Sequence, residues 1–110
     1  MKYITEGKAV INIREAKKIS KEMEVFYNPV MSLNRDISIL LLNAINKKNL
    51  QIADPLAASG VRSIRFLKES DKTKIRKVFI NDNDKNAVNS IKNNLRLNKI
   101  KSKFVVSNQD

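Results

Sequence analysis

The sequence contains neither cysteine nor histidine. Their absence excludes disulfide bonds, cysteine nucleophiles, metal sites built from thiolates or imidazoles, and catalytic triads that use histidine. Any chemistry performed by this chain must therefore use carboxylates, lysines, backbone dipoles or a bound cofactor.

Long hydrophobic runs are also absent. The longest apolar stretch, residues 37–45, is interrupted by Ser38 and Asn43 and is too short to cross a bilayer. The chain does not open with a basic segment followed by an apolar one, as a secretory signal does. We therefore expect a cytoplasmic protein with no membrane partner. Its 110 residues make one domain at most, or part of one.

Acidic residues are few compared with basic ones. The chain has 11 acidic and 22 basic residues, which gives a net charge of +11. Such a charge fits a polyanionic partner, and nucleic acid is the favoured candidate. An alternative is compositional, because Lys, Asn and Ile make up 43 of the 110 residues and a coding bias would raise lysine content by itself. The basic residues are spread along the chain, so charge alone leaves both explanations open.

The pattern of residues predicts a hairpin segment followed by a long helix. Alternation at residues 9–13, preceded by Gly7, is typical of a strand that forms half of a hairpin. A helix is predicted from Asn34, its N-cap, to about residue 46, because apolar residues repeat there at helical spacing.

Strands and helices then alternate to the end of the chain. Asp84 is expected to cap the last helix, and Asn98 to end it in a left-handed conformation. Alternating elements with short linkers predict an α/β fold in which right-handed crossovers join three parallel strands. The predicted strands are residues 50–53, 77–81 and 103–107, and the predicted helices between them are residues 61–69 and 85–97.

Each of these predicted strands is followed by a carboxylate, namely Asp54, Asp82 and Asp110. Because the carboxyl ends of parallel strands meet at one edge of a sheet, we expect one cleft that binds a nucleoside-type ligand. The small-residue turn at 57–60 lets backbone amides and a helix N-terminus approach that ligand. The turn is not a G-x-G-x-x-G motif, which argues against a dinucleotide.

Two of these carboxylates have candidate roles. Asp82 lies 22 residues beyond Gly60, at the position that accepts hydrogen bonds from ribose hydroxyls. The alternative is an ordinary carboxylate at a helix start. Asp110 becomes a candidate partner for the exocyclic amine of an adenine if the three strand ends converge.

Two arginines stand at helix starts, where a cation opposes the helix macrodipole. Arg35 begins the long helix and Arg62 begins the helix after the turn. Each is a candidate partner for the carboxylate of a ligand. For Arg35 the alternative is an ion pair with Asp36 or exposure to solvent.

Three motifs carry a resemblance to a known family. Residues 26–36 read Phe-Tyr-Asn-Pro-Val-Met-Ser-Leu-Asn-Arg-Asp, residues 56–65 read Leu-Ala-Ala-Ser-Gly-Val-Arg-Ser-Ile-Arg after Asp54, and Asn81-Asp82 follows. Together they resemble the archaeal and eukaryotic tRNA (guanine-26-N2) dimethyltransferases, and the Glu6-Gly7-Lys8 opening is similar too. The resemblance covers nearly the whole chain.

The resemblance implies a Rossmann-like class I methyltransferase fold with S-adenosyl-L-methionine as cofactor and tRNA as partner. Residues 1–32 would form an N-terminal extension with short strands, and residues 33–110 the N-terminal half of the cofactor-binding domain. By similarity, four residues would contact the cofactor: Arg35 and Arg62 near its methionine moiety, Asp82 on its ribose and Asp110 near its adenine.

The sequence departs from the family in two ways. Pro55 stands where the family more often has alanine. The family's catalytic segment, an Asp-Pro-Phe-Gly-type loop after the fourth strand, is expected beyond residue 110. Neither the Asp54-Pro55-Leu56 segment nor the Asn28-Pro29-Val30 segment replaces it, so the catalytic residues stay unknown and no metal ligands are expected.

We therefore expect this chain to supply the cofactor-binding half of an enzyme that adds one and then two methyl groups to N2 of guanine 26 in tRNA. By itself it should be marginally stable and inactive, and a C-terminal portion or a separate chain should complete it. Two other hypotheses stay open: a non-catalytic basic RNA-binding module, and a nicotinamide-dinucleotide domain that the missing glycines disfavour.

Overall fold

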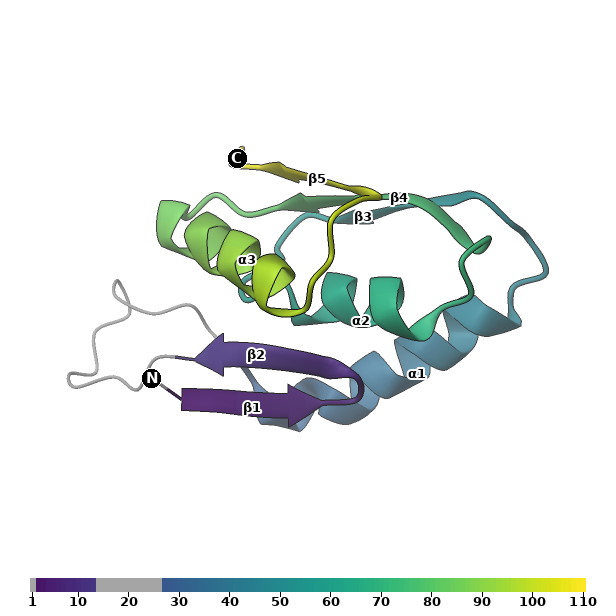
Figure 1. The fold of residues 1–110 in the computed structure, drawn as a ribbon, viewed down its shortest axis with the longest axis horizontal. Helices are drawn as coiled ribbons and strands as arrows, with labels where there is room; N and C mark the ends of the chain where they lie inside the picture. Colours follow the sequence, from purple (N-terminus) through teal and green to yellow (C-terminus); the bar gives the residue numbers. More distant parts are fainter. Residues whose placement is uncertain (1, 14–26) are drawn as a thin grey trace.

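The computed structural model describes residues 2–13 and 27–110 (Figure 1). Phe26 of the first motif lies outside the described residues. The predicted alternation of strands and helices is confirmed, and a short 3₁₀ helix, η1, precedes the first α-helix. The elements are β1 (Lys2–Glu6), β2 (Ala9–Ile13), η1 (Pro29–Met31), α1 (Ser32–Ala44), β3 (Leu50–Asp54), α2 (Val61–Glu69), β4 (Ile75–Asn81), α3 (Lys85–Leu97) and β5 (Phe104–Ser107).

The sheet contains β3, β4 and β5 in that order, and both pairs of strands are parallel. Helix α2 connects β3 to β4, and α3 connects β4 to β5. Both helices lie on the same face of the sheet, and the β1–β2 hairpin lies on their far side (Figure 1). The α/β fold with three parallel strands is thus confirmed.

The hydrophobic core lies between the sheet and these two helices. Val78 and Ile80 of β4 belong to one cluster with Ile64 of α2 and Ile91 of α3, and all four are fully buried. Burial of each such side chain stabilises the fold by about 1.5–3 kcal/mol. Phe79 lies between the two buried β4 residues and points to the opposite face, where it is 42% exposed.

Strands β1 and β2 form the predicted antiparallel hairpin, which turns at Gly7. Gly7 has a φ of +56°, and a Cβ atom there would lie 2.6 Å from Nε of Arg65 and from Oε2 of Glu69. The left-handed backbone favours glycine here, and a side chain would also have to displace the ends of the Arg65 and Glu69 side chains. The hairpin tip therefore lies directly against α2.

Two asparagines, one in α3 and one at its C-cap, form hydrogen bonds with the backbone at the edge of the hairpin. Oδ1 of Asn98 accepts from the N–H of Val10 at 2.9 Å, and its Nδ2 donates to the Val10 carbonyl at 2.7 Å. Oδ1 of Asn94 accepts from the N–H of Asn12 at 3.0 Å, and its Nδ2 donates to the Ser59 carbonyl at 2.9 Å. Asn94 therefore connects the hairpin to the turn after β3.

Two predictions about helix ends were wrong. Helix α1 begins at Ser32 as a continuation of η1, which Asn28 caps, so that Asn34 lies inside the helix. Asn98 is the C-cap of α3 but has a φ of −89°, and the left-handed residue is Lys99, with a φ of +57°. The residue after the C-cap is the one that takes the left-handed conformation at many helix ends.

Two surfaces, an apolar stripe and a strand edge, lack a covering element within the described residues. On α1, Leu33, Ile37 and Leu40 are between 55% and 70% exposed at helical spacing. In the sheet, β3 pairs only with β4, so its other edge has no partner strand in the described part of the chain. Exposed apolar stripes and unpaired sheet edges of this kind are contact surfaces.

Among the described residues, none of the helices has the length and hydropathy that crossing a bilayer requires.

Candidate functional site

The carboxyl ends of all three parallel strands meet at Asn81, the last residue of β4. Its Nδ2 donates to the carbonyls of Pro55 at 3.1 Å and Gln109 at 2.9 Å. Its Oδ1 accepts from Oγ of Ser107 at 2.7 Å and from the N–H of Gln109 at 2.9 Å. One side chain therefore joins the end of β4 to the segments that follow β3 and end β5.

Asp82 follows Asn81 and is nearly buried, with 9% of its surface exposed. Its Oδ2 accepts from the N–H of Ala58 and its Oδ1 from the N–H of Asp84, both at 3.0 Å. The Asp82 carbonyl accepts from Nδ2 of Asn108 at 2.9 Å. A carboxylate oxygen accepts two hydrogen bonds, so each oxygen of Asp82 keeps one acceptor position beyond these protein contacts.

The turn after β3 is held by its own backbone. The N–H of Ala57 donates to the Asn81 carbonyl at 2.9 Å, and the N–H of Gly60 donates to the Ala57 carbonyl at 2.8 Å. Gly60 has a φ of +82° and a Cβ atom there would lie 3.4 Å from Ile91. Because Gly60 precedes α2 directly, this turn aims the N-terminus of α2 at the strand ends.

Asp54, at the end of β3, belongs to the same group of charges. Its Oδ2 accepts from Oγ of Ser63 at 2.7 Å. The pKa of Asp54 is raised, mainly by burial and also by the nearby charge of Asp82. The Ser63 hydrogen bond and the charge of Arg62 act in the opposite direction but do not outweigh burial. The carboxylates that end β3 and β4 thus lie near enough to influence each other.

A cavity of about 170 Å³ opens beside this turn. Its walls come from the segment before α1, from the start of α1, from the turn and from the start of α2. Both predicted arginines line it. The lining residues are Tyr27, Asn28, Met31, Arg35, Asp54, Leu56, Ala57, Ala58, Ser59, Val61 and Arg62.

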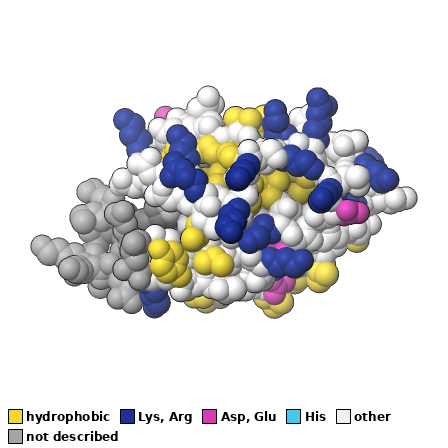
Figure 2. All heavy atoms as spheres, viewed as in Figure 1, with side chains coloured by type: hydrophobic (Ala, Val, Ile, Leu, Met, Phe, Trp, Pro, Cys, Tyr) yellow, Lys and Arg dark blue, Asp and Glu magenta, His cyan; other side chains and the backbone are white. Residues whose placement is uncertain are grey.

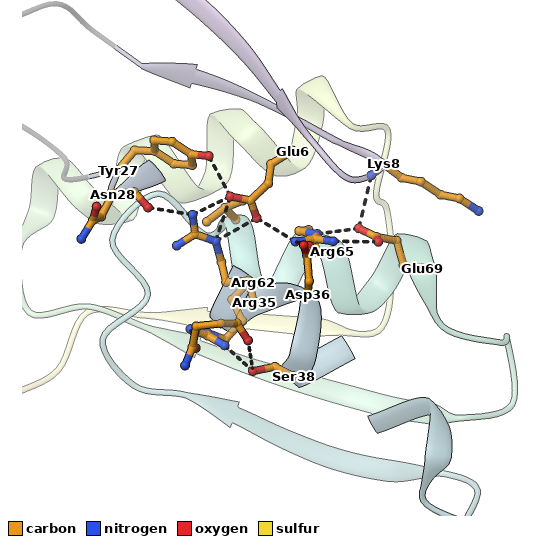
Figure 3. Close-up of polar contacts among 12 residues, drawn as sticks. Glu6, Lys8, Tyr27, Asn28, Arg35, Asp36, Ser38, Arg62, Arg65 and Glu69 are labelled. Carbon is orange, nitrogen blue, oxygen red and sulfur yellow. Dashed lines mark hydrogen bonds and ion pairs between the residues drawn. The ribbon is translucent and has the colours of Figure 1, made fainter. Parts of the chain in front are cut away.

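Arg62 is held by neutral groups of α1. Its Nη1 donates to Oγ of Ser38 at 2.6 Å and its Nη2 to Oδ1 of Asn34 at 2.9 Å (Figure 3). Arg62 forms no ion pair with a carboxylate of the described residues. Its positive charge at the cavity is therefore not neutralised by a direct contact.

Arg35 is buried and bound to Glu6 of β1. Its Nε donates to Oε2 of Glu6 at 2.8 Å, and its Nη2 donates to Oε1 of Glu6 at 2.5 Å and to the Asn28 carbonyl at 2.9 Å (Figure 3). Its guanidinium also lies 5.1 Å from the centre of the Tyr27 ring. The expected alternative pairing with Asp36 was wrong, because Asp36 pairs with Arg65 at 2.7 Å.

Glu6 is the centre of this charge cluster. It accepts from the hydroxyl of Tyr27 at 2.7 Å and from Nη1 of Arg65 at 2.9 Å, besides its bonds with Arg35. Burial raises the pKa of Glu6, but the hydrogen bonds from Arg35, Tyr27 and Arg65 outweigh it and hold the pKa at about 2. The Glu6 carboxylate therefore joins the hairpin to Arg35 of α1 and Arg65 of α2. Arg65 also pairs with Glu69 of the same helix at 2.7 Å.

Asp110 is exposed and follows Gln109, whose backbone bonds Asn81. The structure therefore places Asp54, Asp82 and Asp110 at the same end of the sheet. Arg35 and Arg62 line the cavity beside Asp54. Sequence reasoning missed the roles of Glu6 and Asn81. An amide at the last position of the middle strand is the signal that could have identified Asn81.

The chain matches a family model and several curated relatives. Residues 7–110 match the family described as N2,N2-dimethylguanosine tRNA methyltransferase. The tRNA (guanine(26)-N(2)/guanine(27)-N(2))-dimethyltransferase of Aquifex aeolicus is 42% identical over 104 residues, which are 91% of this chain and 26% of the relative. The tRNA (guanine(26)-N(2))-dimethyltransferase of Methanococcus aeolicus is 38% identical over 113 residues, which are 96% of this chain and 30% of the relative.

Solved structures agree with these matches. Trm1 from Pyrococcus horikoshii, in complex with S-adenosyl-L-methionine, superposes with a TM-score of 0.76 and 38% identity over 93% of this chain and 25% of that one. Trm5b from Pyrococcus abyssi shares the fold alone, with a TM-score of 0.72 and 21% identity over 94% of this chain and 26% of that one. The chain thus spans between a quarter and a third of the relatives' length. The resemblance seen in the sequence is confirmed, and the chain belongs to the N2,N2-dimethylguanosine tRNA methyltransferase family.

Proposed function

We propose that this chain is the S-adenosyl-L-methionine-binding part of an enzyme that methylates N2 of guanine 26 in tRNA. The observation that carries the proposal is the junction at Asn81, which brings the ends of β3, β4 and β5 together beside a cavity lined by two arginines. Relatives that are tRNA dimethyltransferases, and a related structure that holds this cofactor, support it.

The groups at the site suit the chemistry of this cofactor, which supplies an activated methyl group on a sulfonium. Arg62 and Arg35 would bind its carboxylate, and Asp82 would accept from its ribose hydroxyls through the free acceptor positions. Asp110 would accept from the adenine amine. Arg62 would contribute more to the attraction of the carboxylate, because the charge of Arg35 is already paired with Glu6.

The proton-accepting group for the guanine amine would come from polypeptide outside these 110 residues. The uncovered apolar stripe on α1 and the unpaired edge of β3 support this. A further strand that pairs with β3 would also cover the stripe of Leu33, Ile37 and Leu40 if its connecting elements pack against α1. The completing part is thus expected to be a C-terminal portion or a separate chain, with tRNA as the substrate of the whole.

Cofactor binding tests the site. Asp82→Asn should weaken S-adenosyl-L-methionine binding by at least about tenfold, because a charge-assisted hydrogen bond contributes roughly 1.5–3 kcal/mol. Asp84→Asn is the matched control, since Asp84 caps α3 and is a neighbouring carboxylate. Its affinity should stay within about twofold of the unsubstituted chain, because asparagine is also a good cap. Equal losses in both variants, or tRNA binding with no cofactor affinity, would contradict the proposal.

Methyl transfer tests the requirement for a completing part. The chain alone should transfer no methyl group from labelled S-adenosyl-L-methionine to tRNA. Addition of the remaining part of the Methanococcus aeolicus relative should restore transfer. Methylation of tRNA by the 110-residue chain unaided would refute the incompleteness of the catalytic site.

A further inference from the structure

The last part of the chain has a charge distribution unlike the rest. Residues 85–109 contain no aspartate or glutamate and six cations. All six side chains are exposed. We call them the α3–β5 basic surface: Lys85, Lys92, Arg96, Lys99, Lys101 and Lys103. Cations are about as frequent here as in the rest of the chain, so the net positive charge of this segment comes from its lack of acidic residues.

Helix α3 arranges three of these cations in a stripe. Lys85, Lys92 and Arg96 are separated by seven and four residues, a spacing that places them on one face of a helix. The buried Ile91 and Leu95 lie on the adjacent face of the helix. Lys and Arg side chains lie over α3 and over the loop that joins it to β5, with hydrophobic side chains between them (Figure 2). The stripe extends for about 16 Å, at 1.5 Å per residue.

These cations have no carboxylate partners among the described residues. None of the ion pairs found among these residues involves a cation of the α3–β5 basic surface. Nη1 of Arg96 donates to Oδ1 of Asn93, and Nζ of Lys103 donates to the carbonyl of Lys72, so that their contacts are with neutral groups. The positive charge of this surface is therefore available to an anionic partner.

A hollow of about 370 Å³ lies within the surface. Lys92 and Arg96 line it, and its apolar wall includes the half-buried Phe104. A groove with cations beside an aromatic and aliphatic wall suits a nucleic acid strand, because phosphates need the cations and bases or sugars can rest on the apolar part. The other lining residues are Leu95, Ile100 and Val106.

We propose that the α3–β5 basic surface binds the phosphate backbone of the tRNA substrate. The proposal rests on tRNA being the substrate, as proposed above, and adds the surface that holds it. Helix α3 begins three residues after Asp82. The α3–β5 basic surface therefore starts near the strand ends and extends away from the proposed cofactor site. Phosphate contacts of this kind position the RNA without reading its sequence.

A charge-reversal pair of variants tests the surface. Lys92→Glu with Arg96→Glu is compared with Lys47→Glu with Lys48→Glu, which makes the same change in net charge on exposed residues of the loop between α1 and β3. tRNA affinity is measured by fluorescence anisotropy over a range of salt concentrations, and S-adenosyl-L-methionine affinity by calorimetry. Circular dichroism verifies that each variant is folded.

The α3 variant should bind tRNA at least about tenfold more weakly. The magnitude of the slope of log K against log salt concentration should decrease by about 2, because each lost phosphate contact lowers that slope by nearly 1. The loop variant should stay within about threefold. Equal losses in both variants, or an unchanged tRNA affinity in the α3 variant, would overturn the proposal. Cofactor affinity should be unchanged in both variants. If the chain binds tRNA through this surface but never binds the cofactor, the proposed function is refuted and the tRNA-binding surface is still supported.

Discussion

Glu6 is expected to be the most important charged residue for the stability of this fold. The perturbation is Glu6→Gln, which keeps the size of the side chain and removes its charge. Arg35, whose side chain is 7% exposed, then loses its only carboxylate partner among the described residues. Removal of one partner from a buried ion pair costs about 3–5 kcal/mol. Arg65 keeps Asp36 and Glu69, so the loss falls mainly on Arg35.

The pKa of Glu6 gives a second measure of the same quantity. It is lowered from 4.5 to about 2 in the folded chain. A shift of this size corresponds to roughly 3 kcal/mol of stability near neutral pH. Because the folded pKa is below the unfolded one, this contribution is present above pH 4.5 and is lost as the pH falls from about 4.5 towards 2.

Urea unfolding followed by circular dichroism at pH 7 and pH 3 measures both effects. The free energy of unfolding of Glu6→Gln should be about 3 kcal/mol below that of the unsubstituted chain at pH 7, and the difference should shrink to less than half at pH 3. Glu69→Gln is the control and should cost about 1 kcal/mol, because Arg65 keeps two carboxylates. If Glu6→Gln is unfolded in water, an osmolyte such as sucrose restores a measurable transition. A loss below 1 kcal/mol at pH 7, or the same loss at both pH values, would refute the reasoning.

Three further predictions concern the contacts that position the site. Asn81→Ala removes the side chain that joins the strand ends. It should lower the free energy of unfolding, measured in urea, by about 2–3 kcal/mol. It should also weaken S-adenosyl-L-methionine binding in calorimetry, and unchanged affinity would contradict the role of the junction. Asn98→Ala removes the hydrogen bonds to Val10 and should increase amide hydrogen exchange in β2 while cofactor binding changes less than in Asn81→Ala. Arg62→Ala should weaken binding of S-adenosyl-L-methionine more than binding of methylthioadenosine, which has no carboxylate, and equal losses for both ligands would exclude the assigned role.

The order of elements could be predicted from the sequence because it depends on local patterns. Apolar periodicity located α2 and α3, and short apolar runs followed by an acid located the ends of β3 and β4. The convergence of Asp54 and Asp82 followed from the rule that parallel strands end at one edge. These inferences needed only residues near each other in the chain.

The charge cluster around Glu6 could not be predicted in the same way. Glu6 bonds Arg35 and Arg65, which are 29 and 59 residues away. Which carboxylate meets which arginine depends on how the hairpin packs on α1 and α2, and no local pattern encodes that packing. The alternative in which Arg35 pairs with Asp36 failed for this reason, since neighbours in a helix point to different sides.

The most direct test of the central claim is a titration of the isotope-labelled chain with S-adenosyl-L-methionine, followed by the amide signals in NMR spectra. The account predicts that the amides of Ala58, Gly60, Asp82 and Asp110 shift together with one affinity, while those of the hairpin turn at Gly7 stay unchanged. Shifts limited to one strand end, or no shifts at any of the three, would contradict the claim that these strand ends form a single cofactor site.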